Sequence, residues 1–268
     1  MRITFIGGGN MASALIAGLL RQGHDASQLS VVEHNTESCA RLARDYQVNT
    51  FNTLCADAVI SDVIVLAVKP QQLKQVALHL SPLLATQLVV SIAAGVRAAT
   101  LSAWLMGYTR IVRSMPNTPA MIGAGVSALY ALPAVDTVQR QAAADVLNAA
   151  GSVVWVEDES QMDAVTAVSG SGPAYVFYFM EAMQRAGTEL GLPAEVARQL
   201  ALETFLGAAK LALASSEDLA TLRARVTSKG GTTERALLSM QDSRVAESIG
   251  TALHAAAERS RELGDALV

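Results

Sequence analysis

A short strand, a glycine turn and a helix open the chain, and this feature limits its fold more than any other. Residues 3–20 read ITFIGGGNMASALIAGLL, in which Gly7, Gly9 and Ala12 match the pattern G-x-G-x-x-A. The first glycine allows a tight turn, the second lets backbone N–H groups approach a pyrophosphate, and the third position permits close helix–strand packing. The pattern predicts a dinucleotide site here. A tight turn without a ligand is the alternative.

The predicted phosphate contacts span the whole turn and the first turn of the helix. They are Gly7, Gly8, Gly9, Asn10, Met11 and Ala12. A helix N-terminus carries partial positive charge and unpaired N–H groups, which suit an anion.

The end of the second predicted strand bears on which dinucleotide binds. Glu33 stands where an acid would hold the adenosine ribose hydroxyls, which favours NAD. His34 and Asn35 follow directly and could hold a 2′-phosphate, which favours NADP. All three residues could also be solvated loop residues. The cofactor preference therefore stays open on these residues alone.

Short apolar runs alternate with helical patterns in the first half. The predicted strands are residues 3–7, 29–33, 63–68, 88–93, 110–115, 125–130 and 152–156. Helical patterns cover 11–22 and 36–46 between the early strands. Continuous apolar strands alternating with helices predict a parallel sheet that is covered on both faces.

The pattern changes near Met162, after which only helices are predicted. These helices cover residues 173–190, 194–214, 217–225, 233–241 and 243–263. The helix after Pro173 is apolar nearly all round, which is typical of a helix buried on all sides. We expect it to pack against a second copy of the chain in a dimer. A central position in a monomeric bundle is the alternative.

These patterns predict an α/β fold with two domains. A Rossmann-like dinucleotide-binding domain is expected over residues 1–160, and an all-α dimerisation domain over 161–268. The net charge of −4 argues against a nucleic-acid surface. No apolar run is as long as a membrane span, which needs about 18 residues, and no signal peptide is recognised. We therefore expect a cytoplasmic protein. Cys39 and Cys55 are expected to stay reduced.

Three further stretches follow predicted strands. AVKPQQL (67–73) contains Val68, Lys69 and Pro70, SIAAGV (91–96) contains Ala93 and Ala94, and RSMPNTPAMIG (113–123) contains Asn117. Ligands of open α/β sheets bind outside the carboxyl ends of the strands. Each stretch alone is more often an ordinary turn than a site, but three of them at strand ends of one sheet favour a site, so we expect these six residues to contact the cofactor.

Six motifs, taken in their order and spacing along the chain, resemble those of the pyrroline-5-carboxylate reductase family. They are FIGGGNMASA, AVKP, SIAAGV, MPNTP, SGSGPAY and TSKGGTTERAL, and the resemblance covers essentially the whole chain. The resemblance implies NADPH- or NADH-dependent reduction of Δ1-pyrroline-5-carboxylate to L-proline, the last step of proline synthesis. It also implies a helical domain that interlocks with its twin. Dimers are the building block of the family, and many members assemble five of them into a decamer.

The resemblance also assigns a substrate site. In GGTT (230–233), which opens a predicted helix, Gly231, Thr232 and Thr233 offer N–H groups to the substrate carboxylate, and Ser228 can add a hydroxyl. By similarity, Thr233 hydrogen-bonds the imine nitrogen and is the catalytic residue. A plain helix-capping turn is the alternative. Glu159 matches a family position near the substrate, with a solvated loop acid as the alternative.

One departure from the family and two rival functions stay open. Arg225 stands where relatives have Asn near the nicotinamide-side ribose, so it either contacts a phosphate or points to solvent.

The four histidines, His24, His34, His79 and His254, show no metal-ligand spacing, and no metal site is predicted. The rivals are a reductase of a related cyclic imine, such as the six-membered homologue, and a non-catalytic nucleotide-sensing module.

Overall fold

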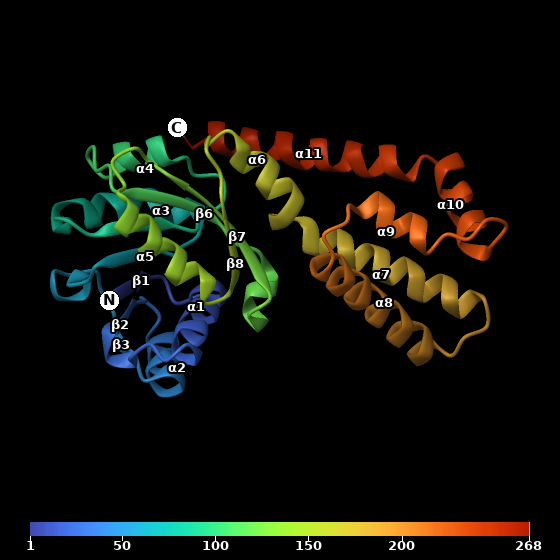
Figure 1. The fold of residues 1–268 in the computed structure, drawn as a ribbon. Coiled ribbons are helices and arrows are strands. Elements are labelled where there is room, and N and C mark those ends of the chain that lie inside the picture. The colour runs from blue at the N-terminus through green and yellow to red at the C-terminus, as the bar shows by residue number, and fades with distance from the viewer. Residues whose placement is uncertain (268) are drawn as a thin grey trace. The chain divides into compact units, whose positions relative to one another are not determined.

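An eight-stranded sheet with the order β3-β2-β1-β4-β5-β6-β7-β8 organises the first part of the chain (Figure 1). The computed structural model describes residues 1–267. The strands are β1 (Ile3–Ile6), β2 (Leu29–Val32), β3 (Asn49–Phe51), β4 (Val63–Leu66), β5 (Leu88–Ser91), β6 (Ile111–Met115), β7 (Gly125–Ala131) and β8 (Gly151–Trp155). The helices of this part are α1 (Asn10–Arg21), α2 (Thr36–Tyr46), α3 (Pro70–Leu80), α4 (Ala98–Trp104), α5 (Thr137–Asn148) and α6 (Gln161–Val165).

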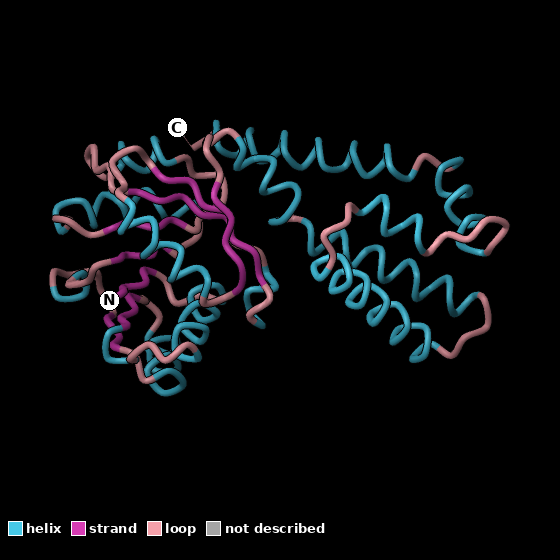
Figure 2. Tube along the Cα trace, in the orientation of Figure 1, coloured by secondary structure: helices cyan, strands magenta, loops and turns pink. Residues whose placement is uncertain are grey.

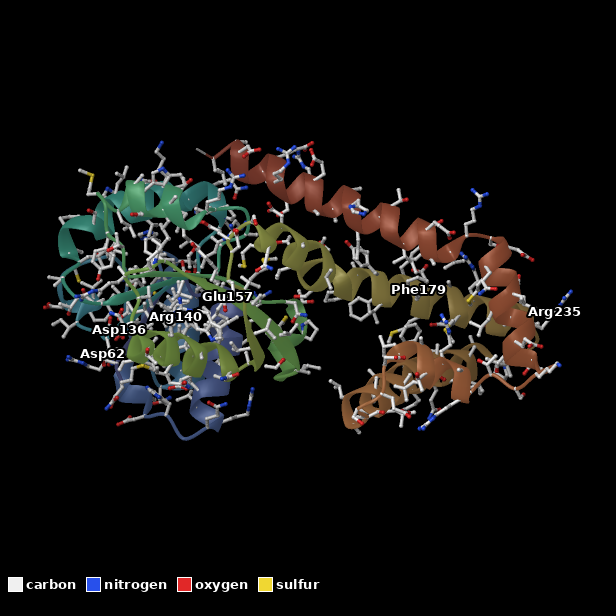
Figure 3. The ribbon with its side chains drawn as sticks, turned by 45° about the horizontal axis from the view of Figure 1, so that its top comes forward. Asp62, Asp136, Arg140, Glu157, Phe179 and Arg235 are labelled. Atoms are coloured by element: carbon white, nitrogen blue, oxygen red, sulfur yellow. The ribbon has the colours of Figure 1, made fainter. Side chains whose placement is uncertain are left out.

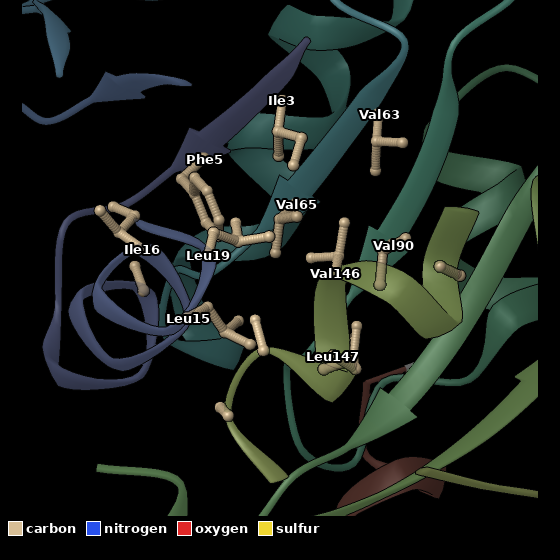
Figure 4. Close-up of a cluster of buried hydrophobic side chains, with 14 of the residues drawn as sticks. Ile3, Phe5, Leu15, Ile16, Leu19, Val63, Val65, Val90, Val146 and Leu147 are labelled. Carbon is tan, nitrogen blue, oxygen red and sulfur yellow. The ribbon is translucent and has the colours of Figure 1, made fainter. Parts of the chain in front are cut away.

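Helices cover both faces of this sheet, as its apolar strands predict. Within β4, Val63 and Val65 join one buried cluster, whereas Ile64 and Leu66 join another, because successive side chains of a strand point to opposite faces. Helices α1 and α5 complete the first cluster, and Figure 4 shows Leu15 of α1 among its side chains. Helices α3 and α4 complete the second cluster.

The sheet departs from the prediction at two strands. Strand β3 was not predicted, since it is only three residues long and its side chains are not fully buried. Strand β7 pairs antiparallel with β6, so the expectation of a parallel sheet is wrong there. Only residues 116–124 join β6 to β7, and a parallel pair needs a crossover of a dozen or more residues. Helix α5 supplies such a crossover, and β8 runs parallel to β7.

Helices dominate from Gln161 onward, and residues 156–267 contain no strand (Figure 2). A π-helical turn, η5 (Thr166–Gly170), follows α6. The remaining helices are α7 (Gly172–Glu189), α8 (Ala194–Ala214), α9 (Leu219–Arg225), α10 (Thr232–Asp242) and α11 (Val245–Asp265). Among residues 1–267, no helix has both the length and the apolar character that crossing a bilayer requires.

Helix α7 is not buried within the single chain, so the alternative of a central position in a monomeric bundle is wrong. It has no buried residue, and Phe177 and Tyr178 are 65% and 71% exposed. Figure 3 shows Phe179, also exposed, on the same helix. Its closest packing partner within the chain is α8. Burial of the apolar side chains of α7 therefore requires a partner outside the chain.

The chain forms two compact units. One comprises residues 1–171 and 256–267, and the other comprises residues 172–255. The end of α11 therefore packs with the sheet-containing unit. Ser260 donates a hydrogen bond of 2.7 Å to Asp163, and Arg97 pairs with Asp265 at 2.6 Å. A Cβ on Gly264 would lie 3.1 Å from the carbonyl oxygen of Gly95, so this helix approaches the loop after β5 closely.

Candidate dinucleotide and substrate sites

The glycine turn between β1 and α1 has the geometry of a phosphate cradle. Gly7 has a φ of +102°, and a Cβ there would lie 2.7 Å from the carbonyl oxygen of Ala67. Gly9 is the N-cap of α1, no side chain caps the helix, and a Cβ on Gly9 would meet nothing within 4 Å. The backbone at Gly9 is therefore open to a ligand, and no side chain occupies the N–H groups at the start of α1, which suits a pyrophosphate.

A cavity of about 640 Å³ lies beside this turn. Its lining includes eight of the predicted cofactor residues, namely Gly7, Gly8, Gly9, Glu33, His34, Asn35, Val68 and Lys69. The other predicted residues, Asn10, Met11, Ala12, Pro70, Ala93, Ala94 and Asn117, do not line it. The structure thus gathers the ends of β1, β2 and β4, while Asn117 instead accepts a hydrogen bond of 2.9 Å from the N–H of Val126.

Sequence reasoning missed the part of the cavity formed by α3 and by the loop after β3. Gln72, Gln75, Val76 and His79 line the cavity from α3. Their spacing is that of one helical face, so a helix beginning at Pro70 could have indicated them. Thr53 and Leu54 were missed because the short strand before them was not recognised.

Hydrogen bonds fix all three residues after β2, so none is simply a solvated loop residue. The carboxylate of Glu33 accepts from the N–H groups of Gly8 (2.9 Å) and Asn35 (3.0 Å). The ring nitrogen Nδ1 of His34 lies 3.0 Å from the carbonyl oxygen of Asn52. The side chain of Asn35 caps α2 by accepting from the N–H of Ser38 at 2.8 Å. Hence the Oδ1 of Asn35 is engaged before any cofactor arrives.

The turn before α10 gathers the predicted carboxylate-binding residues of the second unit. Gly230 has a φ of +75°, and Gly231 is the N-cap. No side chain caps α10, which leaves first-turn N–H groups available at Thr232 and Thr233. Ser228 lies against the turn, since its carbonyl oxygen accepts from the N–H of Gly231 at 3.0 Å.

Glu159 belongs to the sheet-containing unit and is engaged in structural contacts. Its Oε1 accepts from Arg113 at 3.0 Å and from the N–H of Ala98 at 2.6 Å. The side chains of Arg113 and Glu159 are only 6% and 20% exposed. Glu159 is therefore not a solvated loop acid, and its carboxylate joins β6 to the beginning of α4.

Arg225 ends α9 and forms an ion pair with Glu217, with 2.5 Å between Nη2 and Oε1. The Arg225 side chain is 66% exposed. Arg225 therefore does not simply point to solvent, because its charge is paired with that of Glu217 within the same unit.

The residues present suit a dinucleotide. The uncapped N-terminus of α1, the open space at Gly9 and the ammonium group of Lys69 at the cavity supply donors and positive charge for phosphates. Among residues 1–267, no three or more His, Cys, Asp or Glu side chains come together to hold a metal ion. The sheet, the glycine turn and the cavity define a dinucleotide-binding protein of the Rossmann class.

Comparison with known proteins narrows this class to a family. Residues 2–95 match a family model described as NADP oxidoreductase, coenzyme F420-dependent, and residues 159–263 match one described as pyrroline-5-carboxylate reductase dimerisation. The chain is 47% identical to a pyrroline-5-carboxylate reductase of Pseudomonas aeruginosa, over 99% of this chain and 98% of the relative.

Solved structures agree with this similarity. A pyrroline-5-carboxylate reductase of Coxiella burnetii superposes with a TM-score of 0.94 at 41% identity, covering 98% of each chain. The Plasmodium falciparum enzyme, solved with NADP bound, gives 0.86 at 28% identity, again covering 98% of each. The chain belongs to the pyrroline-5-carboxylate reductase family. The match to a dimerisation domain further indicates that it self-associates.

Proposed function

We propose that this chain reduces the cyclic imine Δ1-pyrroline-5-carboxylate to L-proline with NAD(P)H, as the final step of proline biosynthesis. The observation that carries the proposal is family membership over the whole length of the chain. The uncapped glycine turn of α1, beside a cavity of suitable size, supports it independently.

NADP(H) is the proposed cofactor, with NAD(H) as the second candidate. The match of residues 2–95 to an NADP oxidoreductase model supports this choice. The N–H groups at Gly9, Asn10 and Met11 hold the pyrophosphate, and Lys69 neutralises part of its charge. When bound, the reduced nicotinamide supplies the hydride for the imine carbon. Ala93, Ala94 and Asn117, which follow β5 and β6, are proposed to flank the nicotinamide half.

The substrate needs donors for one carboxylate and one hydrogen-bonding group for the imine nitrogen. The first-turn N–H groups of α10, with the hydroxyl of Ser228, bind the carboxylate. The hydroxyl of Thr233 hydrogen-bonds the nitrogen, which orients the ring and assists proton delivery as the imine becomes an amine. Because a protonated imine is already electrophilic, no strong acid is required, and positioning supplies most of the rate.

The proposal includes the assembly, the domain division and the location. Residues 1–160 bind the dinucleotide, and residues 161–268 bind the substrate and form a homodimer, with five dimers in a decamer. The exposed apolar side chains of α7 and α8 support an obligate partner for this region. The reaction uses small water-soluble metabolites, and we propose that it takes place in the cytoplasm.

The test follows the nicotinamide absorbance after racemic pyrroline-5-carboxylate is added to the enzyme with NADPH or with NADH. Consumption of either cofactor with stoichiometric formation of proline is the expected result. If a cofactor binds but is not consumed, the reductase assignment is wrong and a nucleotide-sensing module is favoured. If only the six-membered imine is reduced, the assigned substrate is wrong although the reaction class is right.

A further inference from the structure

Glu33 is hydrogen-bonded through every polar group it has. Its N–H donates to the carbonyl oxygen of Phe51 and its own carbonyl oxygen accepts from the thiol of Cys39, both at 2.9 Å. Burial raises the pKa of the Cys39 thiol, which favours the protonated, donating form. The two carboxylate oxygens accept from the N–H groups of Gly8 and Asn35. A residue whose only role is to bind a ligand does not need these four hydrogen bonds within the protein.

The bond to Gly8 joins Glu33 directly to the phosphate turn. Gly8 is the buried middle glycine, between Gly7 and the N-cap Gly9. A Cβ on Gly8 would lie 2.6 Å from Cδ1 of Leu42 and 3.3 Å from Oε2 of Glu33, so the turn is pressed against this carboxylate. Since the N–H of Gly8 points to Glu33, it is not directed at a phosphate. Its role in the turn is to fix the path of the backbone.

We propose that Glu33 is a positioning residue that holds the glycine turn in its phosphate-binding form, whichever dinucleotide binds. The inference rests on the proposed dinucleotide function of this cavity. It differs from the usual role of an acid at this place, which is to hold the ribose hydroxyls and so to favour NAD. A ribose contact changes the affinity for NADH relative to NADPH. Loss of the anchor weakens both cofactors alike, because both share the pyrophosphate.

Glu33→Asp separates the two roles. Aspartate keeps the charge, and its side chain readily accepts from an N–H two residues further on, so the bond to Asn35 is retained. Aspartate is also as suitable as glutamate for ribose hydroxyls. It is one methylene shorter, however, and does not reach the N–H of Gly8. The variant therefore removes the anchor selectively.

The experiment uses the full-length protein and has two readouts. Amide hydrogen exchange at Gly8 is measured without cofactor, and the dissociation constants of NADH and NADPH are measured by nicotinamide fluorescence. In Glu33→Asp we expect Gly8 to exchange about tenfold faster and both dissociation constants to rise about tenfold, with their ratio unchanged. The matched control is Glu37→Asp, at an exposed acid in the first turn of α2, which should leave every value unchanged.

Unchanged exchange at Gly8, or a change in NADH affinity alone, overturns the proposal. Should Glu33→Asp fail to fold, Glu33→Gln provides the second variant, because an NH2 donor replaces one of the two oxygens that accept from the N–H groups of Gly8 and Asn35. Faster exchange at Gly8 or at Asn35 is then expected, and protection of both contradicts the anchoring role. If the wild type binds neither cofactor, the proposed function fails, whereas the exchange measurement still decides whether Glu33 anchors the turn.

Discussion

At the scale of single residues, Thr233 is the proposed catalytic residue. Thr233→Ala removes the hydroxyl proposed to bond the imine nitrogen but leaves the N–H groups of the α10 turn in place. We expect kcat to fall about 100-fold, the range of a lost catalytic hydrogen-bonding group, with cofactor affinity unchanged. Thr233→Ser should restore most of the activity because it returns the hydroxyl. Steady-state kinetics with unaltered kcat in the alanine variant would remove Thr233 from the mechanism.

Glu159 is expected to act on stability because of its buried partner. Glu159→Ala leaves the guanidinium of Arg113, only 6% exposed, without its carboxylate. Breaking a largely buried pair should lower the free energy of unfolding by about 3 kcal/mol, measured by urea denaturation. As a control, Asp45→Ala breaks the exposed pair with Arg44 and should cost less than about 1 kcal/mol. A raised KM with unchanged stability would instead support the predicted substrate contact.

The sequence predicted the residues whose role is set by local backbone geometry. Gly7 and the glycine at the start of the α10 turn, Gly230, were recognisable because their positive φ favours glycine regardless of the rest of the fold. The partner of Glu159 was not recognisable, since Arg113 is distant in the chain and only the folded sheet brings the two together. The side chains of α3 at the cavity were missed because no helix was predicted over Pro70–Leu80, although their spacing is that of one helical face.

At the scale of elements, α9 offers a test of a helix cap. Asp218 is the N-cap and accepts from the N–H of Thr221 at 2.7 Å, and this bond is the main cause that lowers the pKa of its carboxyl. A lowered folded-state pKa contributes stability above the ordinary carboxyl pKa, near 4, and that contribution is lost as pH falls through the lowered value. We therefore expect the beginning of α9 to loosen only in acid.

The measurement is the NMR shift of the Thr221 amide between neutral and acidic pH. Asn caps helices as well as Asp but does not titrate. In Asp218→Asn the acid transition of this amide should therefore disappear while the helix persists. A transition that survives in the asparagine variant would show that another group governs the amide.

Elements with a strong apolar pattern were predictable from the sequence, and those set by neighbours were not. Helices α2 and α8 occupy the predicted residues, 36–46 and 194–214. Helix α2 begins after Asn35, a residue type that favours a helix start because its side chain caps the first turn. Strand β3 is a three-residue strand that exists through pairing with β2. The antiparallel direction of β7 follows from the short connection between β6 and β7. The apolar periodicity of a strand does not indicate its direction in the sheet.

At the scale of the whole molecule, the second unit has too little apolar burial of its own. Within α8, only Ala197 and Ala201 are buried, while leucines along the same helix are largely exposed. Monomeric proteins rarely expose contiguous apolar surfaces larger than a few hundred Å². The sequence indicated this by the helix after Pro173, which is apolar nearly all round. A second copy that covers these helices would remove the exposed surface, in accord with the matched dimerisation domain.

Phe177→Glu tests this assembly. The side chain is 65% exposed in the single chain, so a glutamate there costs little in a monomer, but a charge at a buried interface without a partner is strongly unfavourable. We expect light scattering after size exclusion to give a smaller particle for the variant than for the wild type. Val138→Glu is the matched control, since Val138 is 79% exposed on α5 of the sheet-containing unit, and its particle size should not change. Equal sizes for wild type and Phe177→Glu would place the contact between copies elsewhere, because a dimer held by α7 does not tolerate an unpaired charge at its centre.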